Sequence, residues 1–192
     1  MRVIKNLLAI VGAIALLVVI VGYFQAQSFL SRLDPGAVGM YSEFMSRFSE
    51  TLDPADAMVW SIPVEEGLTP EDVQESMKSL AVSRNFLFVG ESPFYKQAEA
   101  VTGEPYRYVS FLSFCDVRVG MEMAEYNDAY TSFMPCRIAI VEDQEGKLWL
   151  HSLNLDMMIY GGKPLPPHLK EGALRVRDTI LEIMQGAARG EF

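Results

Sequence analysis

The sequence predicts an α+β protein: one N-terminal transmembrane helix, then a domain with a single antiparallel sheet and helices packed on it. Residues 7–24 carry no charge and are almost wholly aliphatic, and about 20 such residues span a bilayer as a helix. Further along, short apolar runs typical of strands alternate with segments of helical spacing. The 192-residue chain is long enough for one domain beyond the anchor and short for two.

The charges around the apolar stretch predict its orientation. Arg2 and Lys5 precede it, and positive residues stay on the cytoplasmic side. We therefore expect a cytoplasmic tip at 1–6, an anchor at 7–26, and a periplasmic remainder at a bacterial inner membrane. A cleaved signal peptide is the rival interpretation. The bulky Phe24 at the candidate cleavage site, together with the length of the apolar run, favours an uncleaved anchor.

Residues 27–53 predict a linker followed by an amphipathic helix. A turn signal at 34–36 ends the anchor region. Met40, Phe44, Phe48 and Leu52 then recur at helical spacing between polar residues. This helix is expected to pack on the domain, and contact with the membrane or a partner is the alternative, so its apolar face is a candidate interface.

The remaining residues, 54–192, predict the periplasmic α+β domain. Thr69 and Pro70 begin a helix, because Thr caps the helix and Pro suits its first position. Residues 143–146 join two strands as a hairpin loop with Gly146 at its end. Strands are expected at 57–64, 85–89, 107–114, 136–142 and 147–153, and helices at 70–81, 94–101, 116–126, 155–159 and from 166 onward.

Composition argues against several function classes. The net charge of −9 disfavours nucleic acid and anionic lipid headgroups as partners. The two histidines are too few for a histidine-rich metal site, and the sequence contains no Gly-x-Ser-x-Gly or phosphate-binding loop. His151 is expected to be structural, and the acids 142–143 to be solvated turn residues. We therefore expect no cofactor, no metal and no catalytic site.

Two cysteines, Cys115 and Cys136, are the residues most suited to chemistry. Cys115 ends one predicted strand and Cys136 begins the next. If these strands are antiparallel neighbours, the sulfurs lie within bridging reach. A structural disulfide or a pair of buried thiols is the first interpretation. Redox or sulfur-transfer chemistry is the second, with Arg118 and Arg137 able to stabilise a thiolate.

A soft-metal site is the third interpretation of the cysteines. Met121, Met123 and Met134 flank them in sequence, and sulfur ligands suit Cu(I). Methionine is more often core filler, and two residues spaced two apart on a helix point in different directions. Nearby, Tyr130 and Phe133 are predicted to form an apolar lip, a further candidate interface.

The segments around the cysteines carry a family resemblance. Phe114-Cys115-Asp116 and 134–138, with 85–89 and 105–107 before them and 141–147 after, resemble the family known as domain of unknown function 302. The resemblance covers about 58–159. Asp116-Val117 stands where the family commonly has Asn-Pro, and Met134 replaces Leu. The resemblance implies a small α+β domain that tends to self-associate, favours antiparallel strands at the cysteines, and assigns no catalytic residue.

Taken together, these features predict a periplasmic domain that binds a partner. The leading hypothesis is an accessory subunit without its own catalytic site, bound to another copy of itself or to a larger membrane complex. The alternative is a thiol-disulfide or sulfur-transfer protein using Cys115 and Cys136, since many members of the resembled family occur in sulfur-oxidising bacteria.

Overall fold

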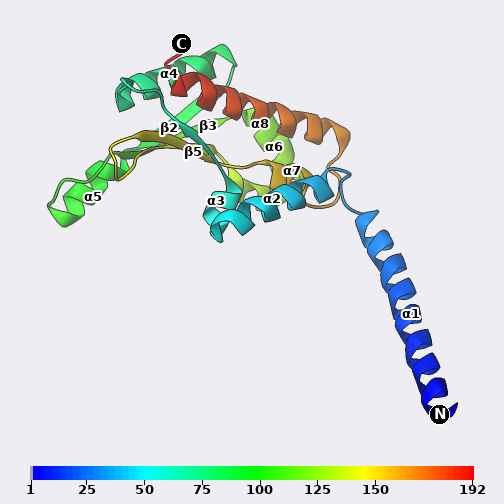
Figure 1. The fold of residues 1–192 in the computed structure, drawn as a ribbon. Helices are drawn as coiled ribbons and strands as arrows, with labels where there is room; N and C mark the ends of the chain where they lie inside the picture. Colours follow the sequence, from blue (N-terminus) through cyan, green and yellow to red (C-terminus); the bar gives the residue numbers. More distant parts are fainter. Residues whose placement is uncertain (1) are drawn as a thin grey trace.

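The computed structural model describes residues 2–192, apart from the side chain of Val3, so Met1 of the expected cytoplasmic tip lies outside the described residues. The arrangement is α+β, as predicted (Figure 1). The strands are β1 (Val59–Pro63), β2 (Leu87–Ser92), β3 (Val109–Cys115), β4 (Cys136–Glu142) and β5 (Leu148–Leu153). The helices are α1 (Arg2–Leu30), α2 (Ala37–Thr51), α3 (Pro54–Met58), α4 (Pro70–Ser83), α5 (Phe94–Thr102), α6 (Val117–Tyr126), the 3₁₀ helix η1 (Asp128–Phe133), α7 (Asp156–Tyr160) and α8 (Pro167–Ala188).

All neighbouring strands of the sheet are antiparallel, in the order β1-β5-β4-β3-β2. The predicted hairpin between β4 and β5 is present, with Gly146 at a positive φ of 81° in its loop. At one end of the β3–β4 ladder, Phe114 of β3 lies opposite Cys136 of β4. Side chains alternate between the two faces along a strand, so this register places Phe114 and Cys136 on the same face.

The helices α4 and α8 pack on one face of the sheet and on each other. Sheet residues of this face, among them Leu112, Phe114 and Ile140, are fully buried against Met77 of α4 and Ile183 of α8. A second apolar cluster, which includes Val119 of α6 and Ile159 of α7, continues this core along α8. The core therefore lies between the sheet and a helical layer, as the periodicity predicted.

Two short helices were not predicted. The strand expected from 57 starts at Val59, because Asp53 accepts a hydrogen bond from Ala55 N–H and begins α3. The segment before Cys136 contains η1, where Asn127 caps Ala129 N–H. A side-chain cap begins each helix. Both helices are too short for a helical spacing of apolar residues to be recognised in the sequence.

Helix α1 is long and apolar enough to cross a membrane, and its apolar stretch is not buried against the domain. It projects away from the domain beside the start of α2 (Figure 1). Asp34, in the connection from α1 to α2, is almost fully buried and pairs with Lys170 of α8. Its own backbone N–H donates to the carbonyl of Gly162, and its carboxylate caps Gly36 N–H. The C-terminal end of α1 is thereby attached to the domain.

The Asp34–Lys170 pair gives a testable contribution to stability. We expect Lys170→Met to lower the free energy of unfolding by about 1–3 kcal/mol, because the buried carboxylate loses its partner. This range lies between the losses typical of exposed ion pairs and those of buried ion pairs. Denaturant unfolding of the full chain in detergent measures this change. Lys147→Met removes an ion pair to Glu145 in which both side chains are well exposed, and it should leave the unfolding free energy nearly unchanged.

The same pair predicts a pH dependence. Burial raises the pKa of Asp34, but the hydrogen bonds from Lys170 and Gly36 N–H and the charge of Lys170 outweigh burial, and the net pKa is lowered. The stabilisation is therefore complete above about pH 4 and is lost as the pH falls through the lowered pKa. The stability of Asp34→Asn should vary less with pH in this acid range than that of the unmodified chain, and equal acid sensitivity would contradict the assignment.

Candidate functional site

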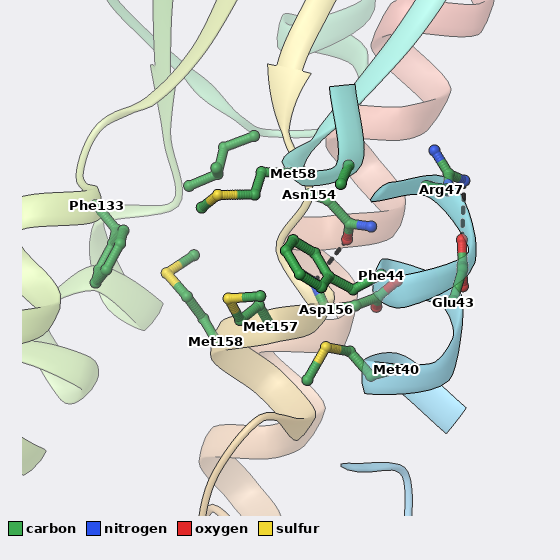
Figure 2. A pocket seen from close by; sticks show the side chains of 12 residues that line it. Met40, Glu43, Phe44, Arg47, Met58, Phe133, Asn154, Asp156, Met157 and Met158 are labelled. Atoms are coloured by element: carbon green, nitrogen blue, oxygen red, sulfur yellow. Dashed lines mark hydrogen bonds and ion pairs between the residues drawn. The ribbon is translucent and has the colours of Figure 1, made fainter. Parts of the chain in front are cut away.

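An apolar cavity of about 190 Å³ lies between α2 and the rest of the domain. Figure 2 shows Met58, Met157 and Met158 pointing into the space between Phe44 of α2 and Phe133 of η1. We call this space the methionine cavity; it is lined by Met40, Glu43, Phe44, Arg47, Ala57, Met58, Phe133, Leu153, Asn154, Asp156, Met157 and Met158.

Local sequence explains how these side chains reach the cavity. Met40 and Phe44 are one helical turn apart on α2, so both face the domain. Met157 and Met158 lie on α7, which begins where the side chain of Asn154 accepts a hydrogen bond from Asp156 N–H at 2.9 Å. Unbranched methionine side chains adapt to irregular apolar shapes, so a cavity with this lining can accommodate more than one apolar group.

Each charged side chain that lines the cavity forms an ion pair. Glu43 and Arg47, one turn apart on α2, form an ion pair at 2.8 Å (Figure 2). Asp156 pairs with Arg177 of α8 at 3.2 Å. The cavity therefore offers an apolar interior with a charged rim, which suits binding of an apolar group better than acid-base or nucleophilic chemistry.

A second, smaller cavity of about 70 Å³ contains both cysteines. We call it the cysteine cavity; it is lined by Cys115, Asp116, Val119, Gly120, Met123, Tyr130, Phe133, Met134, Cys136, Leu155, Met158, Ile159, Ala173 and Val176. Phe133 and Met158 belong to both cavities. The two cavities are thus neighbours, and sulfur-bearing side chains line both.

The strand pairing brings the cysteines together. Strands β3 and β4 are antiparallel neighbours, and Cys115 follows Phe114, whose partner across the ladder is Cys136. Both cysteines are half-buried free thiols. The expectation that they lie at the same end of adjacent strands is therefore confirmed, and the formation of a disulfide stays a prediction.

The surroundings of the thiols disfavour the thiolate. Burial, and secondarily the charge of Asp116, raises the pKa of Cys115. Burial, and then proximity to Cys115, raises the pKa of Cys136 to about 11 against the smaller effect of a backbone hydrogen bond. Asp116 itself caps α6 by accepting from the N–H groups of Arg118 and Val119, both at 3.1 Å.

The two arginines predicted to activate the thiols have other surroundings. Arg137 lies over the ring of Phe111 at 5.1 Å from its centroid, on the sheet face opposite Cys136. Arg118 is exposed at the start of α6. Since both thiol pKa values rise, the geometry gives neither arginine a role in lowering them.

The candidate interface residues gather around the two cavities. Met40 and Phe44 line the methionine cavity, Tyr130 lines the cysteine cavity, and Phe133 lines both. Phe48 lines neither, but its ring stacks on that of Phe44 with centroids 6.2 Å apart. Sequence reasoning missed three further members, Met58, Met157 and Met158. Their only signal is the abundance of methionine, 11 in the chain.

The other residues considered from sequence have varied surroundings. Met121 is 65% exposed, whereas Met123, two residues later, is buried and lines the cysteine cavity. His151 Nδ1 and the Ser61 hydroxyl are 2.9 Å apart across β1 and β5, and burial lowers the histidine pKa. Asp143 serves the hairpin, accepting from Lys147 N–H and from the indole N–H of Trp149.

Comparisons with known proteins agree with this fold. A family model described as a domain of unknown function, DUF302, matches residues 60–187, which is more than half of the chain. The match continues beyond 159 and includes most of α8. A crystal structure of an uncharacterized conserved DUF302 protein from Bacillus stearothermophilus superposes with a TM-score of 0.56 at 13% identity, covering 69% of this chain and 98% of that one. No curated protein matched the sequence.

The raised pKa values predict slow alkylation of the native thiols. At about pH 7.5 we expect iodoacetamide to modify both cysteines more slowly in the folded chain than in denaturant. For Cys136 the rate should fall at least tenfold, because a pKa of about 11 leaves less than a tenth of the thiolate that an unperturbed thiol has. Cys136, the more strongly shifted thiol, should react last. Mass spectrometry of a timed reaction measures both rates, and rapid native labelling at neutral pH would contradict this account.

Proposed function

The chain belongs to the DUF302 family, and within that fold we propose that it acts as a membrane-anchored binding domain. It serves as an accessory subunit without a catalytic site of its own. Its binding site is the methionine cavity, which holds an apolar segment of a membrane-protein partner. The observation that carries the proposal is an apolar, methionine-lined cavity built partly by α2, the helix that directly follows α1.

The position of the cavity supports a partner at the membrane. Only residues 31–36 separate α1 from α2, and Asp34 attaches this connection to α8 through Lys170. The Tyr41 hydroxyl donates to the carbonyl of Gly161 at 2.7 Å, which attaches the first turns of α2 to the loop after α7. Met40 and Phe44 lie in these turns, so the cavity is held close to the end of the anchor.

The side of the membrane follows from charge. Arg2 and Lys5 precede the apolar stretch, and the positive-inside rule keeps them in the cytoplasm. The domain then lies on the periplasmic side of a bacterial inner membrane. There it can reach membrane proteins whose extracytoplasmic segments approach the bilayer.

The chemistry of the cavity describes the partner. Methionine-rich surfaces accept varied apolar side chains by repacking. Apolar anchors surrounded by charged rims are typical of protein interfaces. The net charge of −9 favours a contact surface with basic residues around an apolar centre, because opposite charges steer association. A second copy of this acidic chain is a less favourable partner, because two chains of the same charge repel.

Phe44→Asp tests the cavity as the contact site. A carboxylate placed in an apolar interface loses its hydration without gaining a partner, so the complex extracted in mild detergent should fall to below about one tenth of its normal yield, a loss of at least 1.4 kcal/mol. Val101→Asp is the matched control, since Val101 is 86% exposed on α5. Crosslinking and native mass measure the yield.

The outcomes of this experiment are separable. A complex with another membrane protein that is lost in Phe44→Asp and kept in Val101→Asp supports the proposal. A homodimer that is lost in Phe44→Asp and kept in Val101→Asp would identify the occupant of the cavity as a second copy of this chain. An isolated monomer from native membranes, or a complex insensitive to Phe44→Asp, would overturn the proposal. Circular dichroism of both variants identifies a failure to fold.

Thiol chemistry is the second candidate, favoured by the convergence of two free thiols on one cavity. In this alternative, one thiol forms a mixed disulfide or carries a sulfur atom and the other resolves it. Cys115→Ser and Cys136→Ser would each abolish turnover: replacing the attacking cysteine prevents loading, and replacing the resolving cysteine traps the mixed disulfide or persulfide. Intact mass after exposure to a small disulfide or persulfide donor distinguishes the two. The unfolding free energy should change by no more than about 1 kcal/mol, the usual size for a point substitution. Loss of folding without any transfer chemistry would identify a structural pair instead.

A further inference from the structure

The geometry of the cysteine cavity points to a site for one soft monovalent metal ion, and we propose that it binds Cu(I) through the sulfur atoms of Cys115, Cys136 and Met134. This inference is independent of the methionine cavity as a partner site. It rests on the placement of sulfur atoms around an open point above α6.

Gly120 creates the open point. A side-chain carbon placed on Gly120 would lie 3.3 Å from Met134 Sδ and 3.6 Å from Cys115 Sγ. The two sulfur atoms therefore approach one point in space from β3 and from the segment before β4. Because glycine has no side chain, the space between this point and the two sulfur atoms contains no side chain of residue 120. Metal–sulfur bonds are about 2.3 Å long, so an ion bound by both sulfurs lies between them and away from the Gly120 backbone, and the flexible methionine can adjust the position of its sulfur.

The remaining lining supplies a third sulfur and excludes harder ligands. Cys136 lines the same cavity from β4, and Met123 and Met158 also reach it. The other lining residues are mostly apolar. Asp116 is engaged elsewhere, because it caps two backbone N–H groups of α6 and its other oxygen lies 3.9 Å from Arg175. The donor set is thus two thiols and thioethers, which selects Cu(I) over oxygen- and nitrogen-seeking cations.

Binding of Cu(I) exchanges thiol protons for the metal. The S–H bonds of Cys115 and Cys136 break, Cu–S bonds form in their place, and two protons leave to solvent. The Met134 thioether donates as a neutral ligand, which favours Cu(I) over Zn²⁺, because thioethers are not among the usual ligands of Zn²⁺. No change of oxidation state is involved.

Met134→Leu tests the site with little change of shape. The full chain, without a histidine tag, is reduced, freed of metal and titrated anaerobically in detergent with Cu(I) against a chromophoric Cu(I) chelator. We expect one equivalent to bind. Met134→Leu and Cys115→Ser should each weaken the dissociation constant by at least about tenfold, since even outer-shell changes at metal sites cost 10–100-fold. Met121→Leu is the matched control, because Met121 lies on α6, the helix of Gly120, and is 65% exposed.

Gly120→Ala provides a second test that removes no sulfur. The added methyl group would occupy the point shared by Met134 Sδ and Cys115 Sγ and should also weaken Cu(I) binding by about tenfold or more. Gly39→Ala is its control, since a methyl group at Gly39 of α2 would meet no atom within 4 Å. Unfolding curves of each variant establish that the fold is retained.

Three results would overturn the proposal. The first is a reduced chain that takes no Cu(I) from the chelator. The second is uptake that Met134→Leu, Cys115→Ser and Gly120→Ala leave unchanged, which places the ion elsewhere. The third is binding of Zn²⁺ in preference to Cu(I). Stoichiometric Cu(I) uptake that follows the sulfur variants and Gly120→Ala, but not Met121→Leu or Gly39→Ala, would support it.

Discussion

The pairing of β3 with β4 is the constraint on which the other features depend. These strands are central to the sheet, and their register places Phe114 opposite Cys136. A shift by one residue would move Leu112 and Phe114 from the buried face to the open face, and would remove the main contacts of α4 and α8. The same register brings Cys115 and Cys136 to one end of the sheet. Core packing and the cysteine cavity therefore have a common origin.

The helical layer extends this constraint toward α1. Helix α8 packs on the sheet along the main core and also contacts α6 and α7. Its Lys170 pairs with Asp34 before α2, and α7 supplies Met157 and Met158 next to α2. The position of α2 is thus set by contacts with the folded domain as well as by its link to α1. The connection that follows α1 is therefore held against the domain.

Two neighbouring cavities with related linings suit different ligands. The methionine cavity lies on α2 and has a charged rim, which suits an apolar segment of a partner. The cysteine cavity is smaller and adds two thiols, which suits a soft ion. Phe133 and Met158 belong to both, so a ligand that repositions either side chain in one cavity also changes the wall of the other.

The sequence by itself determined the features that depend on local pattern. The long apolar helix α1 follows from an uncharged run, α4 from the Thr69 cap and Pro70, and the β4–β5 hairpin from the loop that ends in Gly146. The predicted strands placed the two cysteines at strand ends. Each of these signals lies within about twenty residues of chain, which is the range over which periodicity and capping act.

Only the tertiary structure decided which side chains meet. Met58, Met157 and Met158 come from separate elements, and none carries a local signal that it faces Phe44. Likewise, Met123 and Met134 reach the cysteines while Met121 points to solvent, and Arg137 lies on the opposite sheet face from Cys136. The physical reason is that apolar burial has no preferred direction. The sequence marks residues for burial, and the packing of helices on the sheet selects their neighbours.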